Sequence, residues 1–141
     1  MAVKSKLISL SMVICDAVID DRRTGKKSLI GIFNNVITPV IPSVSPRLNV
    51  FIAITEGHGD YVGKIRCLKV GTEQEIFGME GPFKFSDPRQ ILEFNFEIVG
   101  LVFPDYGDYR FEFLANNEPV TARKFTVSKP IDLGKNHDKN S

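Results

Sequence analysis

Apolar and polar side chains alternate along several segments of this chain. Residues 92–98 read Leu-Glu-Phe-Asn-Phe-Glu-Ile, residues 109–113 read Tyr-Arg-Phe-Glu-Phe, and residues 8–14 show a weaker form of the pattern. Successive side chains of a β-strand point to opposite faces, so this period of two predicts strands with one buried and one solvated face. No helix-length segment has the period of an amphipathic helix, and only residues 74–79 leave room for a single helical turn.

The segments between these strands agree with the pattern. Residues 48–55 form a nearly continuous apolar and β-branched run, which predicts a central strand. Polar turns at 20–27, 56–60 and 116–118 separate the strands, and prolines make residues 38–47 a non-helical connection. Short strands between turn signals predict an all-β fold, an immunoglobulin-like antiparallel β-sandwich of about 7–9 strands.

The length of the chain sets its domain organisation. With 141 residues and 43% hydrophobic content, it suits one packed domain and leaves no room for a second. We therefore expect a single sandwich over residues 1–128. Residues 129–141 are mostly polar and are expected to form a flexible C-terminal tail.

One motif has a specific structural meaning. The segment Asp105-Tyr106-Gly107-Asp108-Tyr109 follows one alternating strand and begins the next. Its spacing resembles the corner that joins strands E and F in immunoglobulin-type domains, where a tyrosine hydroxyl bonds a backbone group a few residues upstream. The structural corner is therefore assigned to Asp105, Gly107 and Tyr109. The core differs from that of antibody domains, because Phe111 stands where the second cysteine would be and the chain has no tryptophan.

Several short segments together resemble a known family. They are Cys15-Asp16, Thr24-Gly25-Lys26, residues 29–33, residues 101–104 and Gly107-Asp108-Tyr109. Over about residues 10–127 the chain is similar to a family of small bacterial domains of unknown function that are expected to be immunoglobulin-like sandwiches. The resemblance implies that fold and a bacterial, cytoplasmic origin. It carries over no catalytic residue.

Charge and cysteine content narrow the location and the partners. The 18 basic and 17 acidic residues nearly cancel, which argues against nucleic acid as a partner. No stretch is long and apolar enough for a transmembrane helix, so no membrane contact is expected. Two cysteines, Cys15 and Cys67, are too few for a disulfide-stabilised secreted scaffold, and they favour a cytoplasmic protein. The sequence leaves open whether the two thiols are free.

The titratable residues do not suggest catalysis. The only histidines are His58 and His137, and no phosphate-binding loop or paired-cysteine motif occurs. We therefore expect no enzyme activity, no cofactor and no metal. The alternative is an ion- or small-ligand-binding sandwich. It would use the carboxylates of Asp105 and Asp108, which suit calcium, or the turn that carries Glu56, His58 and Asp60.

An apolar region suggests a protein partner instead. Residues 37–44 are rich in proline and β-branched side chains, and the strand that follows is apolar on both faces. A sandwich strand normally has one polar face, so either the proline-rich connection or a second chain must cover it. The sequence therefore predicts a non-catalytic module for protein interaction or self-association. Its candidate partner surface consists of Ile37, Val40, Ile41, Val44, Phe51 and Ile52.

Overall fold

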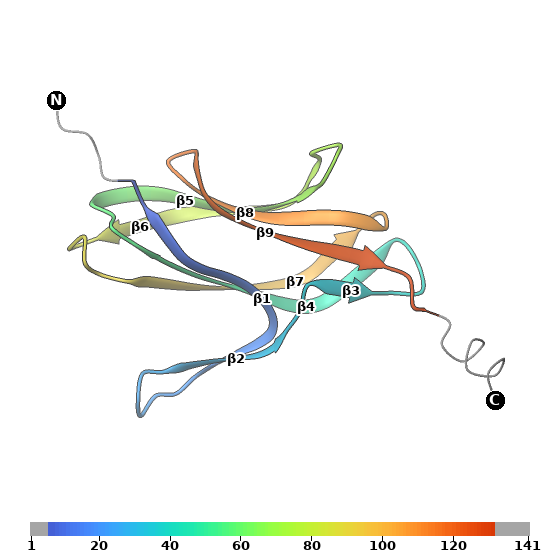
Figure 1. Ribbon diagram of the computed structural model, residues 1–141, viewed down its shortest axis with the longest axis horizontal. Helices are drawn as coiled ribbons and strands as arrows, with labels where there is room; N and C mark the ends of the chain where they lie inside the picture. The colour runs from blue at the N-terminus through green and yellow to red at the C-terminus, as the bar shows by residue number, and fades with distance from the viewer. Residues whose placement is uncertain (1–5, 132–141) are drawn as a thin grey trace.

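Nine β-strands in two sheets make up the regular structure of the computed structural model, which describes residues 6–131 (Figure 1). One sheet has the order β2-β1-β4-β7 and consists of β1 (Ile8–Asp20), β2 (Lys27–Ile32), β4 (Ser43–Thr55) and β7 (Leu92–Phe103). The other has the order β3-β9-β8-β5-β6 and consists of β3 (Asn35–Ile37), β5 (Gly59–Lys69), β6 (Glu75–Phe85), β8 (Gly107–Ala115) and β9 (Glu118–Ser128). The all-β sandwich is confirmed. The pairing of β3 with β9 is parallel, whereas a fully antiparallel fold was expected.

The alternating residues build the core between the sheets. From β4, the inward side chains include Val50, Ile52 and Ile54, and from β8 they include Tyr109 and Phe111; all five are fully buried. Burying a side chain of this size contributes about 1.5–3 kcal/mol relative to leaving it in water. The strand predicted to be central, β4, lies between β1 and β7 in the observed sheet.

A tyrosine fixes the crossing from one sheet to the other between β7 and β8. The Tyr109 hydroxyl donates a hydrogen bond of 2.7 Å to the backbone carbonyl of Asp105 and lies 3.3 Å from the Asp105 backbone nitrogen, whose N–H it accepts. Gly107 has a φ of 126°, a conformation that favours glycine. Burial raises the pKa of the Tyr109 hydroxyl above its usual value, so this group stays protonated and can donate.

The hairpin formed by β1 and β2 folds across the outer face of the four-stranded sheet. β1 pairs with β4 only up to Cys15, and its second half continues with β2 alone. Figure 1 shows this hairpin turning back beneath the sheet. At its far end Lys27 forms an ion pair of 2.9 Å with Glu93 of β7, two strands beyond β1 in the sheet order. The hairpin therefore crosses the outer face of β1 and β4.

This arrangement corrects part of the predicted partner surface. Ile52 is fully buried in the core, and Phe51, on the opposite face of β4, is only 7% exposed. The prediction that these two side chains contact a partner is therefore wrong, because the chain itself buries both.

Two segments differ from the sequence prediction. β4 begins at Ser43, inside the expected connection, and it includes Pro46. The proline is tolerated because β1 pairs with β4 only from Asn49 onward, so no hydrogen bond on that side is lost. The single helical turn considered for residues 74–79 is wrong, since these residues enter β6, which pairs with β5 along its length. No helix among residues 6–131 is long and apolar enough to cross a membrane.

Candidate functional site: an aromatic slot between two edge strands

The two sheets end on one side of the sandwich in unpaired strands. β7 is the last strand of the four-stranded sheet and β6 is the last strand of the five-stranded sheet. Residues of both strands line the same cavity of about 220 Å³. The candidate site is this cavity, which we call the aromatic slot. It is lined by Gly63, Met79, Glu80, Gly81, Pro82, Phe83, Phe94, Phe96 and Phe113.

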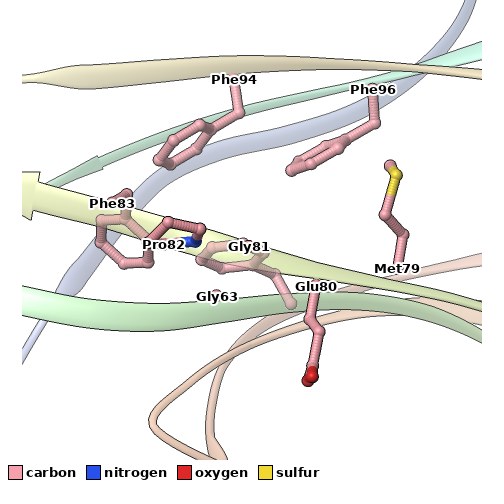
Figure 2. Close-up of a pocket in the computed structure, with 9 residues that line it drawn as sticks. Gly63, Met79, Glu80, Gly81, Pro82, Phe83, Phe94 and Phe96 are labelled. Atoms are coloured by element: carbon pink, nitrogen blue, oxygen red, sulfur yellow. The ribbon is translucent and has the colours of Figure 1, made fainter.

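Phenylalanine rings form most of the slot wall. Figure 2 shows Phe94 and Phe96 of β7 on one side and Phe83 with Met79 of β6 on the other. The Phe83 and Phe94 rings meet edge to face with centroids 5.3 Å apart. Phe113 of β8 packs against both rings of β7, with its ring centroid 5.7 Å from that of Phe94 and 6.3 Å from that of Phe96. The slot therefore presents a continuous apolar wall whose rings hold one another in place.

Two paired glycines shape the slot in different ways. Gly63 of β5 and Gly81 of β6 are partners in the β5–β6 ladder. A Cβ on Gly63 would lie within 3.1 Å of the Phe83 and Phe113 rings, so glycine is needed there to admit these rings. A Cβ on Gly81 would meet nothing within 4 Å. The absent side chain at Gly81 therefore leaves open the space that the other residues surround.

The slot leaves large apolar side chains in contact with solvent. Phe83, Phe94 and Phe96 are only half-buried, and Met79 is 42% exposed. Isolated apolar side chains on a surface are ordinary, but neighbouring ones around a concavity are typical of binding sites. Concave shape and exposed apolar area thus coincide at the slot.

The two edge strands differ in their capacity to pair with another strand. β6 contains Gly78, Gly81 and Pro82 near its middle, and these residues weaken a strand or remove a donor. β7 has neither glycine nor proline from Leu92 to Val99. The more regular free edge beside the slot therefore belongs to β7.

Residues of both turns predicted as an ion site form structural hydrogen bonds. The Asp108 carboxylate accepts a 2.9 Å hydrogen bond from the Thr126 hydroxyl, which is the role of a structural side chain. At the other proposed turn, the backbone N–H groups of Glu56 and His58 donate to the Pro88 carbonyl and the Tyr61 hydroxyl. Within residues 6–131, no three histidine, cysteine, aspartate or glutamate side chains are grouped to hold a metal ion.

The proline-rich part of the predicted partner surface is partly exposed. Ile37, Val40 and Val44 are 60–64% exposed, whereas Ile41 packs against the core. The Tyr106 hydroxyl donates a 3.0 Å hydrogen bond to the Thr38 carbonyl and fixes the start of this connection. None of these residues lines the aromatic slot.

Both cysteines are free and buried. Burial raises the pKa of the Cys67 thiol to about 12, so it stays protonated at neutral pH and is a poor nucleophile. Burial also raises the pKa of Cys15. Neither thiol lines the slot.

Sequence reasoning missed the slot because its residues resemble core residues. Phe94 and Phe96 alternate with polar side chains in the same way as fully buried residues do. The signal that remained was the segment Gly78-Met79-Glu80-Gly81-Pro82, in which small residues replace bulky ones. Small residues on one strand opposite aromatic rings on another leave a hollow, but the positions of β6 and β7 relative to each other have to be known first.

The chain belongs to a family of unknown function (DUF6941), whose model matches residues 10–128. Among solved structures it is similar to the crystal structure of the C-terminal domain of wzt, with a TM-score of 0.52 and 12% sequence identity. The match covers 91% of this chain and 77% of that chain. This likeness shows the fold. No curated protein matches the chain.

Proposed function

We propose that this chain is a non-catalytic interaction module that binds a protein partner through the aromatic slot. The observation that carries the proposal is the position of the slot. It lies between two edge strands, and its partly buried Phe94 and Phe96 belong to β7, the more regular of the two free edges. A partner that adds a strand to a sheet uses two kinds of contact: hydrogen bonds to the free backbone edge, and apolar side chains inserted into a neighbouring pocket. The edge of β7 and the slot offer both.

The volume of the slot favours a side chain over a free small molecule. Pockets for drug-sized ligands usually measure about 300–1,000 Å³, whereas this slot measures about 220 Å³. A space of this size accommodates one or two apolar side chains of a neighbouring segment. Binding such side chains removes aromatic surface from water, which is the dominant driving force in protein association.

The chemistry of the lining supports a role without catalysis. Glu80 is the one titratable residue among the lining residues, and it is exposed. Acid–base or nucleophilic catalysis requires at least one positioned titratable group with a partner that tunes it. We also propose a cytoplasmic location, which two buried free thiols support because reducing compartments keep thiols unpaired.

Capture from the native cells with two matched variants tests this function. Gly81→Leu fills the slot, whereas Lys84→Leu adds the same side chain to the same strand on an exposed residue outside the slot lining. We expect a stoichiometric partner to be retained by the wild-type protein and by Lys84→Leu, and to be lost by Gly81→Leu. Retention of the partner by a folded Gly81→Leu protein, or a wild-type protein that captures no partner, would count against the proposal.

A further inference from the structure

We infer that the partner contributes an extended segment in which apolar and basic side chains alternate, and that this segment pairs with β7. The inference rests on the proposed function and names the chemistry of the partner at the same slot. Three features of the described residues carry it: the free edge of β7, the alternation of its side chains, and the charge of its outer face.

The free edge of β7 offers a complete backbone template. β7 pairs with β4 on one side only, from Leu92 to Phe103. Its first eight residues contain no glycine or proline that would interrupt a second ladder. An added strand would extend the four-stranded sheet and lie directly over the opening of the slot, because Phe94 and Phe96 line that opening. β6 is the poorer template because it carries Gly81 and Pro82.

The alternation of β7 determines which side chains the added strand needs. Phe94 and Phe96 face the slot, so the residues opposite them in a new strand face the slot as well. Glu93, Asn95 and Glu97 are exposed on the other face of β7. The residues that pair with these three are solvated, and those that pair with Glu93 and Glu97 lie beside carboxylates. The added strand must therefore alternate apolar residues, which point into the slot, with basic residues, which lie beside the carboxylates.

Charge also selects a basic partner over a second copy of this chain. Glu97 forms no ion pair with any residue between 6 and 131, and the same is true of Glu80 at the rim of the slot. Glu93 has one exposed ion pair, with Lys27 of the hairpin. Two antiparallel copies of β7 whose pairing is centred on Asn95 would place Glu93 of one copy opposite Glu97 of the other. Like charges on paired strands are destabilising, so self-pairing at this edge is disfavoured.

Model peptides separate the contributions of shape and charge. The probes are blocked peptides of about seven residues that alternate valine with lysine, valine with glutamate, or serine with lysine. Binding is measured by calorimetry at low salt with the full chain, and backbone amide shifts locate the site. We expect the valine–lysine peptide to bind at β7, and the other two peptides to bind at least about tenfold more weakly.

Two variants complete the test. Gly81→Leu should abolish binding of the valine–lysine peptide, and Glu97→Lys should weaken it about tenfold while leaving the melting temperature unchanged. Equal binding of the valine–glutamate peptide would overturn the basic preference but leave the slot as an interaction site. Binding that survives Gly81→Leu, no binding of any peptide, or a concentration-dependent dimer that Gly81→Leu dissociates would overturn the inference. The capture experiment with Gly81→Leu tests the proposed function separately. If the captured partner is lost in that variant but no model peptide binds β7, the slot remains an interaction site and only the inference about the partner's chemistry fails.

Discussion

Filling the slot at Gly81 should stabilise the protein. The Cβ of a leucine at this position meets nothing within 4 Å, and the backbone of Gly81 is not left-handed. A leucine that is about half buried in the slot contributes about 1 kcal/mol. Replacing a glycine within a strand adds about 0.5–1 kcal/mol, because the unfolded chain loses conformational freedom. We therefore expect Gly81→Leu to raise the free energy of unfolding by about 1.5–2 kcal/mol and the melting temperature by about 6 °C.

The paired glycine provides the matched control. Gly63 lies opposite Gly81 in the same ladder, but its Cβ would press against the Phe83 and Phe113 rings. Gly63→Ala should therefore destabilise the protein by about 1–3 kcal/mol through overpacking. Gly81→Ala isolates the backbone contribution and should stabilise by less than Gly81→Leu does.

Urea unfolding followed by far-UV circular dichroism measures all three variants, and tyrosine fluorescence serves as a second probe because the chain has no tryptophan. The reasoning predicts opposite signs for substitutions at two paired glycines. A destabilised Gly81→Leu together with a neutral Gly63→Ala would refute the description of the slot.

Three further predictions concern the rest of the fold. Tyr109→Phe should lower the free energy of unfolding by about 1–2 kcal/mol through loss of the corner hydrogen bond, and a neutral result in urea unfolding would remove that role. Phe111→Ala should cost about 3–5 kcal/mol because the ring is fully buried, whereas Phe96→Ala should cost about half as much because its ring is only half-buried; equal losses in thermal melts would contradict this difference. Burial acts to raise the pKa of Glu112, but hydrogen bonds from Arg110 and Arg66 outweigh it and hold this pKa below its usual value. The stabilisation is thus complete above the unfolded-state pKa of about 4.3 and is lost as the pH falls through the lower folded pKa, so Glu112→Gln should lose less stability than wild type between about pH 5 and pH 3; parallel curves would contradict this.

The sequence predicted the sandwich because its strands obey a local rule. A period of two depends only on neighbouring residues. The strong alternation in residues 109–113 predicts a strand, and these residues lie within β8. β6 was missed because its glycines and proline break the alternation, and only pairing with β5 makes this segment a strand. The corner motif was visible because a tyrosine that bonds to a residue four positions upstream is itself a local feature.

The candidate site could not be predicted in the same way, because it depends on contacts between distant segments. The slot combines residues of β5, β6, β7 and β8, and no short motif encodes their proximity. The error over Phe51 has a similar origin. An apolar residue on an outer face indicates a cover, but the sequence does not show that the β1–β2 hairpin turns back over this face, as the ion pair between Lys27 and Glu93 indicates.

Mapping of a bound partner by backbone amide chemical shifts tests the central claim most directly. The isotope-labelled chain would be titrated with the protein captured from its native cells. The account predicts that the largest changes occur along Leu92–Val99 of β7 and at Gly81 of β6, around the aromatic slot. Changes concentrated on Ile37, Val40 and Val44, with the residues of the slot unaffected, would contradict it.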